Sequence, residues 1–464
     1  MSATGLYTAI TAGGILNINF VNGRLLTAED LSGLQTANAQ QHQQLARATG
    51  EGVAYGFEVS LAPSSSPRSP IVRVTRGLAF NRKGNAAALA TDYVDVALVK
   101  SADVQTTSSG FFAECPPPQP LLQNTNLGLY VLTVMPASTL QGSVSVVDFN
   151  SSGMASSCSS RFAAEGVQFQ LDPLQIGSGD ATSVRGQLSA LAQTLEPELA
   201  TLANLSGAAQ SQFAIQIAPQ LSLFRNLAAH LCFGTETLAT FPAEIFPGAS
   251  GAPFPVGYSA LDDMRTAGLI TDCEIPLALV YWTSSGLVFL DPWAVRRTVT
   301  QPHASIKWAP FVNARRAREA LAIFLQFQDH ISGLLSALPT ASMIGAVATD
   351  YFRFLPALGF LPLSSAAGSG FSLPVFFAGR TVRDPVYVEG SREEFLVLRS
   401  LAYSPIDFAS QEMIWLYWVR ENKEEIASLG NQGPLPYLVF TNGQLRFQGE
   451  ANFDLNYWDY ANYV

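Results

Sequence analysis

The chain has 464 residues, of which 48% are hydrophobic and only 13% are charged, with a formal net charge of −10. That length predicts about two or three domains, and the charged fraction lies well below the roughly 25% of an average soluble protein. A net negative chain is a poor match to nucleic acid, whose binding proteins carry a basic surface. Low charge, together with 36 Gly and 27 Pro, indicates that much of the surface is buried against other chains.

The first predicted element is a helix over residues 28–49. Thr27 is a suitable N-cap, and Asp30 stands at the spacing of a capping box. Gly50 and Gly52 end the helix, and the alternating apolar residues from Val53 to Val59 then predict a strand.

One face of this helix has heptad spacing with a polar middle: Leu31, Leu34, Asn38, Gln41, Leu45 and Ala48. Polar residues at such positions set register and oligomer state at a cost in stability, which favours packing against a partner chain. The alternative is a helix lying half exposed on its own β domain. We take the first five of these residues as candidate assembly contacts.

The remaining pattern predicts an α+β multidomain chain, with a small antiparallel β domain, a central helical segment and a C-terminal mixed α/β region. The predicted divisions are an N-terminal docking segment (1–61), the antiparallel β domain (62–172), the helical segment (173–235) and the C-terminal mixed α+β domain (236–464).

Prolines mark several of the expected breaks. The stretch from Pro136 to Gly142 joins two predicted strands, Pro197 restarts a helix, and Pro219 takes the first position of another. Residues 375–377 predict a strand, and Ser391 with Glu394 predicts a capping box.

An amphipathic helix is predicted over residues 313–331. Arg315, Arg316 and Arg318 lie in its first turns, where the helix dipole disfavours cations. They are therefore either contacts for a partner or, as the more ordinary alternative, part of a solvated charged face.

The sequence contains none of the motifs G-x-S-x-G, G-x-G-x-x-G, Walker A or H-E-x-x-H. Of the four histidines, His230 and His330 stand near expected helix C-termini, where a cation is favoured. His42 lies in a Gln-rich stretch of the first predicted helix, and His303 follows Pro302 in a loop. We predict no catalytic, cofactor-binding or metal-binding residues and no enzyme activity. A hydrolase with a site assembled from scattered residues is the least favoured alternative.

The four cysteines, Cys115, Cys158, Cys232 and Cys273, have no metal-ligand or redox-motif spacing. Free buried thiols are the simplest interpretation, with synthesis in a reducing cytoplasm. The first residues lack the charged and apolar regions of a signal peptide, and no uncharged apolar stretch is suited to spanning a bilayer.

Aromatic clusters near the C-terminus allow two interpretations. Trp415 and Tyr417 share one face of a predicted strand and Trp418 lies opposite, while Trp458 and Tyr460 belong to a later cluster. Exposed rings would bind a ligand such as a glycan, whereas rings covered on both sides belong to a core or an interface. We favour the second and keep Trp415, Trp418, Trp458 and Tyr460 as candidate ligand or interface aromatics.

The N-terminal region resembles a module of baseplate-associated proteins from contractile phage tails and extracellular contractile injection systems. The resemblance covers about residues 18–98 and is carried by residues 20–31, by the glycine-flanked strand 52–59 and by Gly77-Leu78-Ala79. The helix differs from that family in being rich in Gln rather than charged and aromatic. Weaker similarity extends to residues 225–234, 291–297 and 415–422.

This resemblance implies a non-enzymatic structural subunit of a tail-like particle, attached through its N-terminal segment and acting by protein–protein contact. The implied partners are other particle subunits and further copies of the chain, with no nucleic acid and no membrane insertion. The implied location is a particle assembled in the cytoplasm, either retained or released. A receptor- or glycan-binding protein of such a particle is the alternative.

Overall fold

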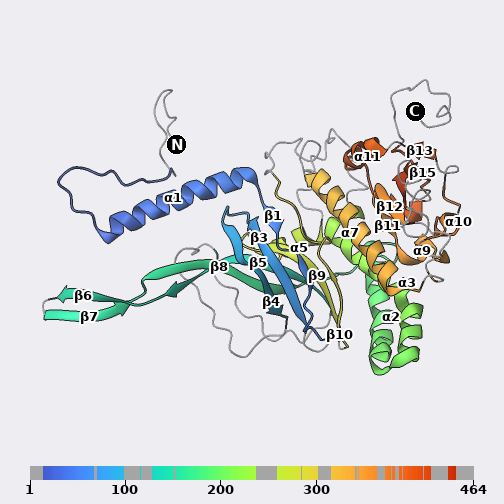
Figure 1. Ribbon diagram of the computed structural model, residues 1–464, viewed down its shortest axis with the longest axis horizontal. Coiled ribbons are helices and arrows are strands. Elements are labelled where there is room, and N and C mark those ends of the chain that lie inside the picture. The colour runs from blue at the N-terminus through green and yellow to red at the C-terminus, as the bar shows by residue number, and fades with distance from the viewer. Residues whose placement is uncertain are drawn as a thin grey trace, which may run out of the picture.

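The computed structural model shows the predicted α+β arrangement, with an elongated N-terminal part and a broader C-terminal part (Figure 1). The residues that the structure describes are 14–66, 70–98, 115, 128–150, 153–236, 259–283, 285–300, 315–339, 342, 344–362, 371–377, 379–381, 386–388, 390–410, 412–419 and 437–445.

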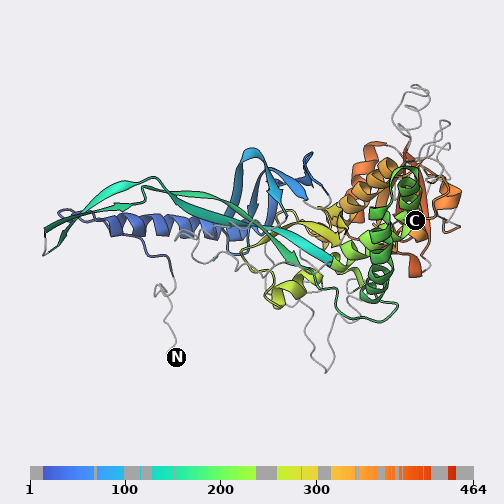
Figure 2. The same cartoon turned by 90° about the horizontal axis from the view of Figure 1, so that it is seen from below.

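The predicted first helix is confirmed with its expected limits, as α1 (Ala28–Thr49). The capping box is formed, because the Asp30 backbone N–H donates to Thr27 Oγ1 (3.2 Å) and the Thr27 N–H donates to Asp30 Oδ2 (3.1 Å). Gly50 ends the helix at φ 111° and donates its N–H to the Ala46 carbonyl. Figures 1 and 2 show α1 projecting away from the rest of the molecule, with its N-terminus at the free end.

The first sheet contains β1 (Gly52–Gly56), β2 (Val59–Leu61), β3 (Ile71–Phe80) and β4 (Ala86–Ala97). β3 pairs with all three of the others, and a tight turn over residues 81–85 joins it to β4. The single strand predicted from Val53 to Val59 is interrupted, because a bulge follows Val53 and Phe57 adopts φ 53° with its ring fully buried.

The second sheet has the strand order β10-β9-β5-β8, built from β5 (Gly128–Gln141), β8 (Phe162–Pro173), β9 (Ile275–Thr283) and β10 (Gly286–Asp291). The loop expected at Pro136 is wrong, since β5 continues through it and pairs Pro136 with Val167 of β8. Pairing with β9 ends at Val134, so β5 is an edge strand there, a position that accepts proline.

The two sheets pack face to face around Phe57, Val72 and Val74 from the first and Leu132 and Val280 from the second. The other face of the second sheet packs on α2 (Val184–Asn204) and α3 (Gly207–Phe233), next to α5 (Ala260–Thr266). The expected helix starts at prolines are wrong, because Pro197 lies inside α2 and Pro219 inside α3. Packing between the two helices holds them continuous despite the missing N–H groups.

The C-terminal part consists of α7 (Arg315–Ala337), α9 (Ala348–Tyr351), β11 (Phe354–Leu355), β12 (Leu358–Pro362), α10 (Leu373–Phe376), β13 (Val386–Val388), α11 (Glu393–Ser400), β14 (Ile406–Asp407), β15 (Ile414–Val419) and β16 (Tyr437–Asn442). Its main sheet has the order β12-β16-β15-β13, with β13 parallel to β15. The strand predicted at 375–377 is wrong, since residues 373–376 form α10. The capping box at Ser391 is also wrong, because Arg392 is the N-cap of α11 and makes no side-chain capping bond.

Two features cross the predicted divisions of the chain. β9 and β10, which lie beyond residue 236, belong to the same sheet as β5 and β8. Cys115 and Cys273 form a disulfide across 158 residues, so the prediction that all four cysteines are free is wrong for this pair. Cys232 is free and buried, and Cys158 is free and exposed. Only folding brings Cys115 next to Cys273, so no short cysteine spacing could predict the disulfide.

Candidate assembly surface

Residues 14–50 form an arm that leaves the body of the molecule (Figures 1 and 2). Its extended first part turns back along α1, where Ile18 lies so close to Gly33 that an added Cβ would meet its Cδ1 at 3.0 Å. Arg24 forms an ion pair with Asp30 (2.7 Å) near the start of the helix. The arm thus has some internal packing of its own, with Ala37 buried on its inner side.

Hydrogen bonds join the last turns of α1 to the turn between β3 and β4. Gln43 Nε2 donates to Asn85 Oδ1 and Arg47 Nε donates to the Lys83 carbonyl, both at 2.7 Å. The turn approaches the helix through Gly84 (φ 82°), at which a Cβ would lie 2.3 Å from the Gln43 carbonyl oxygen. The arm is therefore fixed at its base and projects freely along most of its length.

The predicted assembly contacts are largely solvent-facing. Leu31 is 51% exposed and Leu45 69% exposed, Asn38 and Gln41 are exposed as well, and Leu34 is partly buried. The inner side of α1 instead presents Asp30 and Ala37. No residue that the structure describes covers the outward leucines, so their role as assembly contacts stays a prediction.

A second projection runs beside the arm. Beyond Val134 the pair β5–β8 continues as a two-stranded ribbon, which extends into β6 (Val144–Asn150) and β7 (Gly153–Ser159). Both figures show the ribbon and α1 pointing in the same direction from the body. Sequence reasoning missed β7 because Gly, Ala and Ser dominate it, and these residues carry little β propensity.

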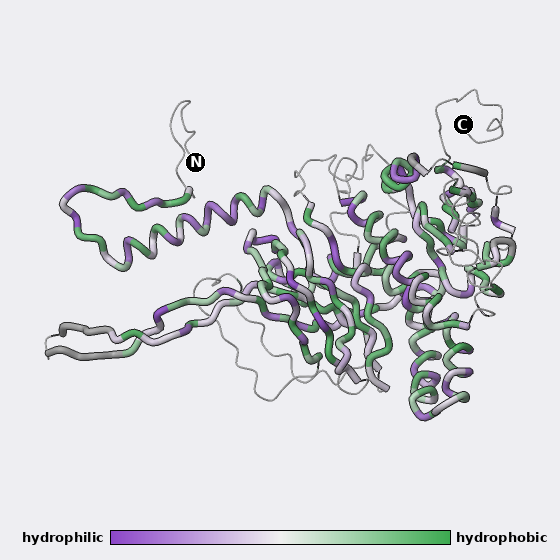
Figure 3. Tube along the Cα trace, in the orientation of Figure 1, coloured by the Kyte–Doolittle hydropathy of each residue, from purple (hydrophilic) through white to green (hydrophobic). Residues whose placement is uncertain are grey.

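Exposed apolar side chains concentrate on these two projections. The hydropathy colours of Figure 3 show that hydrophobic residues alternate with hydrophilic ones along the arm. The two projections account for ten of the seventeen exposed large apolar side chains in the described part of the chain: Leu16, Phe20, Val21, Leu25, Leu26, Leu31, Leu45, Leu140, Val144 and Phe162. Clustered exposed apolar surface marks an interaction site far more often than scattered single residues do.

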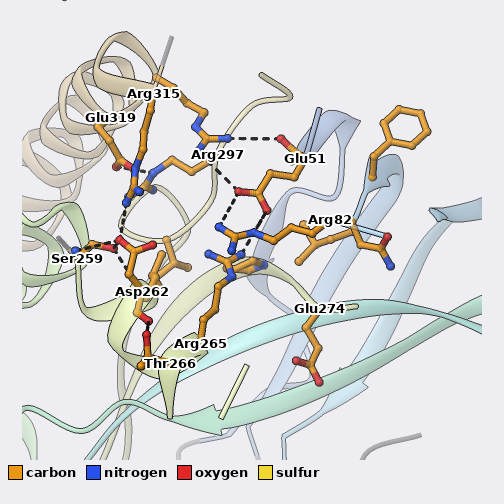
Figure 4. A pocket seen from close by; sticks show the side chains of 18 residues that line it. Glu51, Arg82, Ser259, Asp262, Arg265, Thr266, Glu274, Arg297, Arg315 and Glu319 are labelled. Carbon is orange, nitrogen blue, oxygen red and sulfur yellow. Dashed lines mark hydrogen bonds and ion pairs between the residues drawn. The ribbon is translucent and has the colours of Figure 1, made fainter. Parts of the chain in front are cut away.

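The arm meets the body at a cluster of charges that begins with Glu51, directly after α1 (Figure 4). Glu51 binds Arg82 of the β3–β4 turn at 2.5 Å and lies 3.6 Å from Arg265 of α5 and 3.9 Å from Arg318 of α7. Burial opposes ionisation of Glu51, but the hydrogen bond from Arg82 and the three arginine charges lower its pKa. The carboxylate therefore ties the base of the arm to three separate elements.

The same cluster includes two further ion pairs. Arg297 pairs with Glu319 at 2.6 Å and Arg315 pairs with Asp262 at 2.5 Å. Burial raises the pKa of Asp262, but the charge and hydrogen bond of Arg315, with bonds from Ser259, outweigh it and lower the pKa to about 2. A cavity of about 370 Å³ lies among these side chains.

These contacts correct the interpretation of the arginines at the start of α7. Arg315 and Arg318 are neither solvated nor directed at a partner, since both join the charge cluster inside the chain. Arg316 is partly buried and donates a hydrogen bond to Ser404 Oγ (3.4 Å). The unfavourable helix-end position is tolerated because the acidic partners come from α5 and from residue 51.

The cationic role expected of two histidines is wrong, although His230 does lie in the last turn of α3. His230 and His330 are fully buried, and burial lowers the pKa of His230 to about 3 and that of His330 well below its usual value. Neither therefore acts as a cation at a helix end. His330 Nε2 lies 2.9 Å from Ser222 Oγ, whose hydroxyl donates to the Tyr351 carbonyl (3.1 Å). That hydroxyl is committed to a backbone acceptor, an arrangement suited to packing rather than to nucleophilic attack.

Trp415 and Trp418 are partly buried on opposite faces of β15, each against a different apolar cluster. Trp415 Nε1 also donates to the Gly443 carbonyl (3.2 Å). This matches the prediction of a strand covered on both sides. Trp458, Tyr460 and His303 lie outside the described residues, whereas His42 is exposed on α1.

Within the part of the chain that the structure describes, no group of three or more His, Cys, Asp or Glu is arranged to hold a metal ion. No helix there has the length and apolar character needed to cross a membrane.

Comparison with known proteins finds only weak structural similarity. No protein-family model and no curated protein matches the chain. Among solved structures, a crystal structure of TssK aligns with a TM-score of 0.20 and 11% identity over 55% of this chain and 68% of that one. A structure of the type VI secretion system TssK-TssF-TssG baseplate subcomplex aligns with a TM-score of 0.21 and 11% identity over 55% and 96%. Scores this low do not establish a shared fold.

Proposed function

We propose that the chain is a structural subunit of a contractile injection system or phage-tail-like particle, attached through its arm and acting by protein–protein contact. The observation that carries the proposal is the gathering of exposed apolar side chains on the arm and the ribbon. A monomer gains nothing by exposing them, whereas a subunit would bury them in its neighbours.

The shape and the sequence support the same role. The arm and the ribbon extend a contact surface well beyond the folded body, as docking to neighbouring subunits requires (Figure 2). The residues that resemble the baseplate-associated module lie in the arm and in the sheet at its base. The weak structural neighbours include a chain of a secretion-system baseplate, a finding that agrees with the proposal but does not carry it.

The test exchanges apolar arm residues for charged ones. A Leu31→Glu, Leu45→Glu double variant, tagged and expressed in the native host, should no longer co-sediment with purified particles. Its melting temperature should stay close to that of the wild-type chain, because both side chains are already exposed. The control is Leu398→Glu on α11, since Leu398 is a similarly exposed leucine outside the arm.

Loss of particle association in the arm variant alone would support docking through α1. Wild-type co-sedimentation by the arm variant would contradict docking through this helix face. Equal loss in the Leu398 control would place the contact elsewhere, and a wild-type chain that never accompanies particles would contradict the particle role itself.

A further inference from the structure

The cavity at the base of the arm is lined by an unusual concentration of arginine. Arg82, Arg265, Arg297, Arg315 and Arg318 all border it. The acidic side chains on its lining are Glu51, Asp262, Glu274 and Glu319, and Asp272 also lies 3.9 Å from Arg82. The cavity therefore brings five guanidinium groups together in one partly enclosed space, each near at least one carboxylate.

Several donors in this cluster have no acceptor. Arg265 Nε, Arg297 Nη2 and Arg318 Nε are buried and lack a hydrogen-bond partner among the residues that the structure describes. The Arg297 side chain is only 8% exposed, and its other guanidinium nitrogens are held by Glu319 and by backbone carbonyls. Buried donors without acceptors are rare and costly, and an unseen ion is one standard way in which they are satisfied.

The arginines also lower one another's pKa. Burial lowers the pKa of Arg265, and the charges of Arg82 and Arg315 lower it further, although Glu51 and Asp262 act in the opposite direction. Burial likewise lowers the pKa of Arg318, with Arg297 and Arg315 adding to the effect against Glu319 and Glu51. The arginines thus repel one another despite the neighbouring carboxylates.

We propose that this cavity binds a phosphate group, either as free phosphate or as a phosphomonoester. Phosphate carries up to two negative charges and offers oxygens in several directions, so one ion can accept from donors on separate elements. Guanidinium groups are well suited to this acceptor because their N–H groups form charge-assisted and often bidentate bonds with it.

Binding would add a further link between separate elements of the chain. Arg265 comes from α5, Arg318 from α7 and Arg297 from the segment that pairs with Val53 through its carbonyl (2.9 Å). A bound phosphate would therefore stiffen the base of the arm. The inference does not depend on what the arm docks to.

The experiment is isothermal titration of the full chain with inorganic phosphate at constant ionic strength. Acetate serves as the carboxylate comparison, and adenosine monophosphate serves as the phosphomonoester. We expect saturable binding of phosphate at one site and affinity for acetate at least about tenfold weaker. Binding of phosphate alone would identify the free ion as the ligand, and binding of both phosphate compounds would include phosphomonoesters; either result supports the site.

The variant Arg318→Gln removes a buried unpaired donor and a charge. It loses a long ion pair of 3.9 Å with Glu51 and a hydrogen bond of 3.5 Å to the Glu51 carbonyl. We expect it to weaken phosphate binding by about tenfold or more. Arg353→Gln is the control, because Arg353 is similarly buried and ion-paired with Asp407 (2.7 Å) but does not line the cavity. Arg265→Gln, which also removes a buried unpaired donor and a charge, replaces the first variant if that protein fails to fold.

Absence of saturable phosphate binding to the wild-type chain would overturn the proposal. Equal affinities in the wild-type chain and in a folded cavity variant would overturn it as well, because phosphate would then bind elsewhere.

Discussion

The arm and the body of this molecule use leucine in opposite ways. In the body, Leu188 of α2 is fully buried against α3 and the second sheet, as folding alone would dictate. On the arm, Leu45 is 69% exposed although it stands in a well-formed helix. Burial of apolar surface stabilises a fold by about 25 cal/mol per Å², so the outward leucines of the arm gain that contribution only in contact with another chain.

The ion pairs of the two regions also differ in their exposure to solvent. The ion pair of the arm, Arg24 with Asp30, includes an arginine side chain that is 55% exposed. Where the arm meets the body, Arg297 and Glu319 pair almost entirely out of water. The difference indicates that the base of the arm is built to be rigid, whereas its free length leaves charged and apolar side chains in contact with solvent.

The largest expected effect comes from breaking the buried pair at the base. Glu319→Ala would leave the Arg297 guanidinium buried without its carboxylate, which typically costs about 3–5 kcal/mol. Urea unfolding followed by circular dichroism measures this change. The comparison variant is Asp92→Ala in the exposed pair with Arg76, for which we expect less than about 1 kcal/mol. Similar losses in both variants would show that burial does not set the strength of these pairs.

The next effect contrasts leucines directly. Leu188→Ala should lower the free energy of unfolding by about 2–5 kcal/mol, because it opens a cavity in a packed core. Leu45→Ala should change it by about 0.5 kcal/mol or less, as is usual for exposed positions. Both values follow from the same denaturation assay. A large loss for Leu45→Ala would mean that its side chain is buried against this chain after all.

The third prediction concerns pH. Burial raises the pKa of Asp172 to about 7, helped by the charge of Glu274 and opposed by hydrogen bonds from Thr133 and Gln170. Between about pH 4 and 7 the unfolded chain loses this proton while the folded chain keeps it, so stability falls as pH rises and levels off above about 7. The full effect is at most about 4 kcal/mol, from three pKa units.

Asp172→Asn should flatten this part of the stability profile and make the variant more stable than the wild-type chain at about pH 8. Asn keeps an acceptor for Gln170 and a donor for Thr133, so the packing is preserved. An unchanged pH dependence of the free energy of unfolding in Asp172→Asn would refute the assignment of this effect to Asp172.

On the arm, the backbone hydrogen bond from Thr27 lowers the pKa of Asp30 despite some opposing desolvation, and the Thr27 hydroxyl and Arg24 lower it further. The contribution of Asp30 to the stability of α1 should therefore fade as pH falls below about 4.

The arm was the part of the fold most readable from sequence. The limits of α1 and its capping box follow from Thr27, Asp30 and Gly50, whose effects act over a few residues. Local rules failed where distant segments decide the outcome. Pro197 stays inside α2 because α3 packs against that helix, and Cys115 meets Cys273 only because folding joins positions 158 residues apart.

The candidate surface was predictable in part for the same reason. Heptad spacing was enough to place the outward leucines on one face of α1. The ribbon depends on pairing between β5 and β8, which no short motif predicts. The arginines of α7 illustrate the limit most clearly. Their proximity suggested a solvated or partner-facing patch, but their acceptors, Asp262 and Glu51, lie more than fifty residues away in the chain.

The smallest effect tests the base of the arm by geometry rather than by charge. Gly84→Ala would place a Cβ 2.3 Å from the Gln43 carbonyl at φ 82°, so the β3–β4 turn and α1 must move apart. Gly268→Ala is the matched control, since Gly268 has a similar φ of 71° but no atom within 4 Å of the added Cβ. Both variants carry the cost of a left-handed backbone, about 1 kcal/mol.

Only Gly84→Ala should also change the direction of the arm, which distance measurements between spin labels on α1 and on β4 would detect. The steric cost comes in addition to the backbone cost, so this variant should be the less stable of the two. Identical inter-label distances in Gly84→Ala and the wild-type chain would show that the β3–β4 turn takes up the added Cβ without moving α1. The base of the arm would then not be rigid at the contact between Gly84 and Gln43.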